Sequence, residues 1–184
     1  MLNKGMSKSD IERELKGKGD FVQIDYLTRF LGQKPPLHEK KFAFMKLIEI
    51  YETKKMFNDV AKIYSNLAIL ALSAPERVEA LVKETKAYIQ GGRFDEADAV
   101  MRRAMDEVPI VKKADIYEDI KKFYSQQAGE YGREAKRNHA IKVYEKLLSM
   151  KISDSERNEI KGKLLALYEQ LGKFRESSAL ERKK

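Results

Sequence analysis

Cysteine is absent from the 184 residues of the chain, and histidine occurs only twice. Without cysteine there is neither a disulfide framework nor a thiolate zinc site. The two histidines, His38 and His139, are far apart in sequence and form no metal-ligand pattern. Each is interpreted as a surface or boundary side chain, and we expect the protein to hold no metal ion or other cofactor.

Long apolar segments are missing as well. The sequence contains no apolar run of about 18 residues, and no apolar signal-peptide segment follows the opening MLNKGMSK. We therefore expect a chain that does not insert into membranes and that works in the cytoplasm.

The sequence also has few recognisable catalytic motifs. Gly91-Gly92 and the Lys16–Gly19 run match neither a phosphate-binding loop nor a dinucleotide fingerprint, and there is no serine nucleophile elbow. The acidic residues Asp95, Glu96 and Asp98 have the spacing of a helix start, where carboxylates interact favourably with the helix dipole. We therefore predict that the protein is not an enzyme.

Charge is abundant by contrast. Charged residues make up 36% of the chain, above the roughly 25% of an average globular protein, while 42% are hydrophobic. This combination fits amphipathic helices and argues against disorder. The net charge of +8 is uneven, because residues 1–55 carry 12 basic and 8 acidic side chains, residues 56–110 carry 7 and 9, and residues 111–184 carry 18 and 12. Basic ends can attract phosphates, acidic peptides or ribosomal surfaces, although interspersed charges also fit solvated helix faces.

The segment Tyr88–Pro109 has the pattern of the bend and second arm of a helical hairpin. The first arm is expected over Pro75–Gln90, and Gly91-Gly92 supplies the left-handed backbone that closes a helix at low cost. We expect Phe94 to fill the turn. In the second arm, apolar and small residues recur every three or four positions, and two of them are alanines that let antiparallel helices come close: Ala97, Val100, Met101, Ala104, Met105 and Val108.

The same plan recurs along the chain at steps of 36, 37, 43 and 37 residues, as measured between Ile24, Val60, Ala97, Ala140 and Ser177. Four tyrosines keep this register, and their spacing favours a role as core wedges over a role as stacking platforms for bases. The step of 43 predicts a longer helix, a kink or an expanded loop after the third hairpin. The four tyrosines are Tyr51, Tyr88, Tyr131 and Tyr168.

This pattern resembles the tetratricopeptide repeat family, whose units are helix pairs. In the family, a tyrosine lies late in the first helix, a glycine in the turn, an aromatic and a small residue at the start of the second helix, and a proline at its end. Here the matching residues are Tyr88, Gly92, Phe94, Ala97 and Pro109. The resemblance covers nearly the whole chain and implies an all-α fold, a right-handed α-solenoid of about five helix pairs with the first and last truncated. Family units repeat at about 34 residues, so the longer steps here imply helices lengthened by a turn or more.

We expect a single domain with hairpins at approximately residues 7–36, 38–73, 75–109, 111–151 and 153–184. Ser9–Glu12 is interpreted as a capping box that opens a short helix, with the residues before Ser7 frayed. Ser153–Glu156 predicts a second capping box near the C-terminus. After Pro109 a long helix is expected from about Lys112 to Gln127 or beyond.

The resemblance also implies that the first helices of the pairs line a concave surface. Five residues before each tyrosine the sequence has a lysine or a glutamine, and two further lysines are expected nearby. Such a track suits an acidic peptide or a terminal carboxylate, although solvated groove lysines fit it too. We therefore hypothesise a non-catalytic adaptor that docks a peptide or helix of a partner protein. The candidate contacts are Lys46, Lys83, Gln126 and Lys163 at the equivalent sites, with Lys86 and Lys122 beside them.

Two other kinds of partner remain open. A basic scaffold on RNA or a ribonucleoprotein would use phosphate contacts from the C-terminal third and would lose affinity steeply with salt. No RNP, KH or zinc-finger signature indicates sequence-specific reading. Self-association through an exposed end of the repeat array is the third hypothesis.

Overall fold

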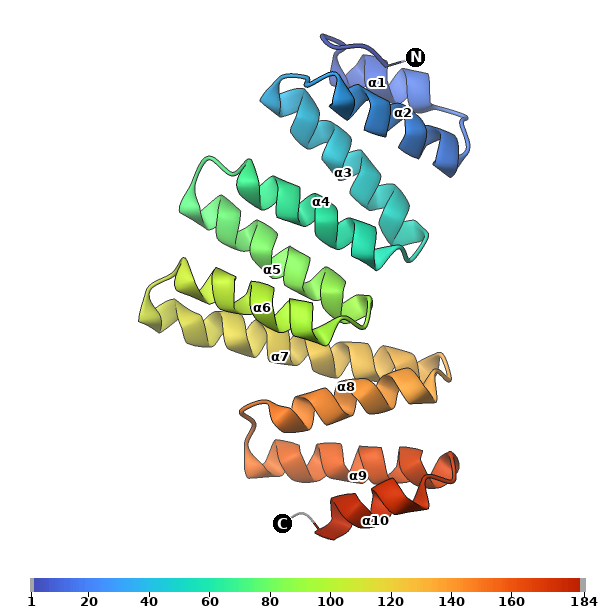
Figure 1. Cartoon of the computed structure of the whole chain (residues 1–184), viewed down its shortest axis with the longest axis vertical. Helices are drawn as coiled ribbons and strands as arrows, with labels where there is room; N and C mark the ends of the chain where they lie inside the picture. The colour runs from blue at the N-terminus through green and yellow to red at the C-terminus, as the bar shows by residue number, and fades with distance from the viewer. Residues whose placement is uncertain (1, 183–184) are drawn as a thin grey trace. The chain divides into compact units, whose positions relative to one another are not determined.

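The computed structural model describes residues 2–182, which form ten α-helices and no β-strand (Figure 1). The prediction of an all-α fold is therefore confirmed. Among these residues no helix is both long enough and apolar enough to cross a membrane. The helices are α1 Lys8–Leu15, α2 Asp20–Gly32, α3 Leu37–Thr53, α4 Phe57–Ile69, α5 Ala74–Gln90, α6 Phe94–Asp106, α7 Ile110–Arg133, α8 Arg137–Ser149, α9 Asp154–Gln170 and α10 Phe174–Arg182.

The chain divides into two compact units, Met1–Pro109 and Ile110–Lys184. We call them the N-terminal unit and the C-terminal unit. The N-terminal unit contains α1 to α6, and the C-terminal unit contains α7 to α10.

Four helix-to-helix turns have the same backbone structure and confirm the tyrosine register. In each turn the fourth residue after the tyrosine has a positive φ: 56° at Lys55, 71° at Gly92, 55° at Ala135 and 67° at Gly172. The N–H of the following residue donates to the tyrosine carbonyl, which is the longer hydrogen bond of a Schellman helix end. These bonds join Met56 to Tyr51, Arg93 to Tyr88, Lys136 to Tyr131 and Lys173 to Tyr168 at 2.8–2.9 Å.

Helix lengths explain the unequal steps of the sequence pattern. The helices α3, α5 and α9 each have 17 residues, and their partners α4 and α6, like α8, each have 13. Helix α7 has 24 residues, which confirms the longer helix expected after Pro109. Gly129 and Gly132 lie inside α7 and do not end it.

Residues no larger than valine are buried at the fourth position of α4, α6, α8 and α10. Val60, Ala97, Ala140 and Ser177 are all at most 7% exposed. The four register tyrosines pack on the cores as expected: Tyr51 and Tyr88 are partly buried, and Tyr131 and Tyr168 are buried.

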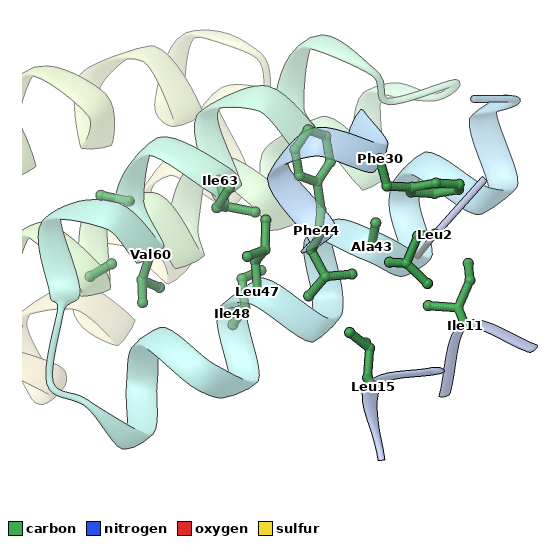
Figure 2. Packing of buried hydrophobic residues seen from close by; sticks show 13 residues of the cluster. Leu2, Ile11, Leu15, Phe30, Ala43, Phe44, Leu47, Ile48, Val60 and Ile63 are labelled. Atoms are coloured by element: carbon green, nitrogen blue, oxygen red, sulfur yellow. The ribbon is translucent and has the colours of Figure 1, made fainter. Parts of the chain in front are cut away.

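The core of the N-terminal unit begins at the very start of the described chain. Leu2 is 2% exposed and packs in one apolar cluster with Ile11, Phe30 and Ala43 (Figure 2). The side chain of Gln33 fixes this segment, because it accepts from the N–H of Lys4 at 2.9 Å and donates to the carbonyl of Leu2 at 3.0 Å. The prediction that the residues before Ser7 are frayed was therefore wrong for residues 2–6.

Two further local predictions were wrong. The capping box of α1 is made by Ser7 and Asp10, whose N–H donates to the Ser7 hydroxyl at 3.2 Å, and not by Ser9. Phe94 does not fill its turn but is 68% exposed. The backbone bond from Arg93 to Tyr88 closes the turn and the Arg93 guanidinium lies 5.8 Å from the Tyr88 ring centroid, so the turn is filled without Phe94.

The two units repeat one pattern at an offset of 80 residues. Lys41 and Lys121 form ion pairs with Glu76 and Glu156, respectively, the latter at 3.0 Å. In the N-terminal unit this pair joins α3 to α5, and in the C-terminal unit it joins α7 to α9. Each glutamate also accepts from a backbone N–H beside its own helix start, that of Leu72 at 2.8 Å or that of Ser153 at 2.7 Å. The same contact therefore holds neighbouring hairpins together in both units.

Candidate binding surface

The six residues predicted to contact a partner are divided between the two units. Lys46 lies in α3 and Lys83 and Lys86 lie in α5, all in the N-terminal unit. Lys83 is exposed, whereas Lys46 and Lys86 are half-buried. In the C-terminal unit the exposed side chains are those of Lys122 and Gln126 in α7 and of Lys163 in α9.

A groove in the N-terminal unit contains Lys83. This α3–α5 groove has a volume of about 200 Å³ and takes its walls from α3, α4 and α5. Its apolar residues include Met45, which is 42% exposed although it lies in the middle of a helix. The lining residues are Lys41, Met45, Tyr64, Leu67, Glu76, Glu79, Ala80 and Lys83.

Lys83 is held in a defined position at this groove. Its ammonium lies 2.7 Å from the Glu79 carboxylate and 5.9 Å from the centroid of the Tyr64 ring. The hydrogen bond to Glu79 raises the pKa of Lys83, and burial raises the pKa of the Tyr64 hydroxyl. At neutral pH the groove therefore presents a fixed cation beside a neutral phenol.

Lys46 lies at a second groove of about 530 Å³, between α1, α2 and α3. Its ammonium is 3.2 Å from Glu12 and 3.1 Å from Glu49, and it lies 5.6 Å from the Phe42 ring centroid. Burial alone would lower the pKa of Lys46, but the hydrogen bonds to Glu49 and Glu12 outweigh it and the net shift is upward. Lys46 is thus already neutralised by two carboxylates and joins α1 to α3.

The C-terminal unit repeats the cluster around Lys83. Lys163 lies 2.5 Å from Glu159, at the spacing of Lys83 and Glu79, and it interacts electrostatically with Tyr144. Because Tyr144 follows Tyr64 by the same 80 residues, tyrosine, glutamate and lysine recur together in both units. The counterpart of Met45 is Ser125, so the exposed apolar anchor belongs to the N-terminal unit alone.

Most residues of the α3–α5 groove were not predicted from the sequence. Lys41, Met45, Tyr64 and Leu67 were not among the candidate contacts, although Lys41 and Tyr64 recur 80 residues later as Lys121 and Tyr144. That repeat was the available signal. The exposure of Met45 has no such signal, because it depends on how three helices pack.

The histidines and acidic residues form no metal site in the described part of the chain. The His38 side chain is 72% exposed, with its Nε2 3.9 Å from a carboxylate oxygen of Glu39. His139 packs its ring against Tyr131 with 5.3 Å between centroids. Both histidines therefore lie where a surface or boundary residue was expected.

No protein-family model matches the chain, and a search of curated proteins finds no relative of it.

Proposed function

We propose that this chain is a non-catalytic adaptor of the tetratricopeptide repeat type, a right-handed α-solenoid that binds a peptide or helix of a partner protein through its first helices. The observation that supports the proposal most directly is the α3–α5 groove, which combines the exposed thioether of Met45 with the cation of Lys83. Methionine adapts its shape to different apolar side chains, which makes it common at protein-binding surfaces.

The chemistry of the groove defines the segment that it would bind. Met45, Tyr64 and Leu67 provide apolar area for one or two anchoring side chains of the partner. Lys83 is paired with Glu79 of the same groove but keeps further N–H donors on its ammonium, so it would favour an acidic residue next to the anchor. We therefore expect an amphipathic segment with acidic residues beside its apolar positions.

A capture experiment with matched variants tests the proposal. The full chain is tagged and used to capture proteins from a lysate of the source cells, in parallel with the double variant Met45→Asp, Lys83→Glu and with the control Lys62→Glu. Lys62 is an exposed α4 lysine that also has an acidic neighbour at i−3, Asp59, but does not line the groove. A partner that the wild type and the control retain and the double variant loses supports the proposal. Equal recovery by all three proteins excludes the α3–α5 groove as the binding surface, provided that circular dichroism shows equal helicity.

Nuclease treatment of half of each lysate separates the protein partner from the nucleic-acid alternative. A direct protein partner stays bound after nuclease treatment. Loss of every partner in the treated half would favour the RNA or ribonucleoprotein scaffold, for which residues 111–184, with 18 basic and 12 acidic side chains, supply the charge.

A further inference from the structure

The α3–α5 groove contains the most exposed methionine of residues 2–182. Met45 is 42% exposed, whereas Met101 and Met150 are each 8% exposed. The other methionines in this range are partly buried: Met6, Met56 and Met105. Because the chain has no cysteine, thioethers are its only sulfur groups. Among residues 2–182, Met45 therefore has the sulfur atom that a dissolved oxidant reaches most easily.

The neighbours of Met45 provide hydrogen-bond donors for an oxidised sulfur. Lys41 lies one helical turn before Met45 on α3, and Lys83 lines the same groove from α5. Glu76 and Glu79 also line the groove, and each is paired with one of these lysines. An ammonium group has three N–H donors, so each lysine keeps donors beyond its ion pair. A sulfoxide oxygen on Met45 would therefore find cationic donors among the residues that line its own groove.

The C-terminal unit lacks an oxidisable group at the corresponding position. The two lysines of the groove recur 80 residues later as Lys121 and Lys163, but the counterpart of Met45 is Ser125. Ser125 is also exposed, and serine has no sulfur. The shared pattern therefore combines its lysines with an accessible thioether in the N-terminal unit alone.

We propose that Met45 is a site of reversible oxidation by peroxides and that its sulfoxide prevents the α3–α5 groove from binding an apolar side chain, an effect that rests on the proposed function. A lone pair of the sulfur attacks one oxygen of hydrogen peroxide, an S–O bond forms and the O–O bond breaks. The proton of the transferred oxygen passes through solvent to the leaving hydroxide, so the sulfur is oxidised to a sulfoxide and the peroxide is reduced to water. The apolar thioether thereby becomes a polar group, which methionine sulfoxide reductases convert back.

The oxidation rates of individual methionines test the site. The full chain, isotope-labelled at the methionine methyl groups, is treated with hydrogen peroxide, and NMR follows the conversion of each methyl signal. We expect Met45 to oxidise about tenfold faster than Met101 and Met150 in the folded chain, and the three to react at similar rates in denaturing urea. Methionine sulfoxide reductases with dithiothreitol should then restore the Met45 signal. Equal rates for Met45 and Met101 in the folded chain, or a Met45 sulfoxide that the reductases leave unchanged, would overturn the proposal.

Capture from a lysate of the source cells tests the effect on binding. After peroxide treatment, the wild type should recover about tenfold less partner than the treated variant Met45→Leu, which is apolar at this position but has no sulfur. The control Met45→Leu, Ser125→Met has an oxidisable side chain at an exposed position that does not line the groove, and it should retain the partner after the same treatment. Equal recovery by the treated wild type and the treated Met45→Leu would overturn the effect on binding. If the untreated wild type captures no partner, the proposed function and this effect fail together, whereas the NMR rates alone decide the oxidation site.

Discussion

The two units differ in chemical character at one buried position of the pattern that they share. Both use the same turn geometry at the register tyrosines and the same lysine–glutamate pair between neighbouring hairpins. In α5 of the N-terminal unit the position holds Glu84, which is 2% exposed. Its counterpart in α9 of the C-terminal unit is Leu164, which is 1% exposed. The same position in the two helices therefore holds a buried carboxyl group in one unit and a buried leucine side chain in the other.

The surroundings of Glu84 only partly compensate for its burial. A hydrogen bond from Ser65 and the charge of Arg103 stabilise the carboxylate, but burial dominates and raises the pKa of Glu84. Its Oε2 atom has no hydrogen-bond partner among residues 2–182. A buried acceptor without a partner costs about 1–3 kcal/mol. At this position the N-terminal unit therefore carries a burial penalty that the C-terminal unit, with Leu164, avoids.

The largest effect is expected when this penalty is transferred to the C-terminal unit. The substitution Leu164→Glu should lower the free energy of unfolding by about 4 kcal/mol, because it removes a buried leucine and introduces a carboxylate. The place of Ser65 is taken by Glu145, whose carboxylate already accepts from the Tyr168 hydroxyl at 2.6 Å and would repel the new charge. Urea unfolding followed by circular dichroism measures the loss.

A neighbouring position controls for the change of residue type. Ala166→Glu places the same side chain at an exposed position of α9 and should shift the unfolding free energy by less than about 0.5 kcal/mol. If Leu164→Glu lowered the free energy of unfolding by less than about 1 kcal/mol, position 164 would tolerate a carboxylate almost as well as the exposed position 166 does.

The reverse substitution should have a smaller effect of opposite sign. Glu84→Leu gives the N-terminal unit the residue of the C-terminal unit and should raise the free energy of unfolding at pH 7 by about 1–2 kcal/mol. The control Glu79→Gln, at an exposed glutamate paired with Lys83, should change it by less than about 0.5 kcal/mol. If Glu84→Leu destabilised the chain, the carboxylate of Glu84 would have to make a net favourable contribution.

Because the pKa of Glu84 is raised, the difference in unfolding free energy between the wild type and Glu84→Leu should depend on pH. Because the folded state binds the proton more tightly than the unfolded state, the wild type loses stability as pH rises from the ordinary value of 4.5 through the raised pKa. Glu84→Leu lacks this titration. Its advantage over the wild type should therefore be fully developed above the raised pKa and should shrink as pH falls toward 4.5. A constant difference between pH 4.5 and pH 8 would contradict the assignment.

Sequence reasoning succeeded where structure depends on local periodicity and failed where it depends on three-dimensional contacts. The register tyrosines and the long helix after Pro109 could be predicted because helix spacing and turn residues are local signals. The burial of Glu84 could not, because a glutamate is normally a surface residue and α5 is covered by both α4 and α6. The candidate lysines lie on the first helices of the hairpins, as expected. The sequence did not indicate, however, that one of the two carboxylates that neutralise Lys46 comes from α1. Their role in binding stays a prediction.

The smallest effect concerns the turns, because the α3–α4 and α7–α8 turns have a side chain at the positive-φ position and the α5–α6 and α9–α10 turns have glycine there. Ala135 has φ 55° and Gly92 has φ 71° at the same place in the pattern. An L-residue pays a conformational cost in this region that glycine avoids. Ala135→Gly should therefore raise the free energy of unfolding by about 0.5–1 kcal/mol, and Gly92→Ala should lower it by a similar amount.

Two features isolate backbone conformation as the cause. A Cβ atom added at Gly92 would meet no atom within 4 Å, so the cost of Gly92→Ala is not a steric clash with the fold. Ala179→Gly, at an exposed helical position of α10, should destabilise by about 0.5–1 kcal/mol, so one type of substitution should act with opposite signs at Ala135 and Ala179. Thermal unfolding of the three variants measures both signs. If Ala135→Gly destabilised the chain as Ala179→Gly does, the left-handed conformation at Ala135 would carry no conformational cost. The presence of glycine or of a side chain in a turn would then not affect the stability of the hairpin.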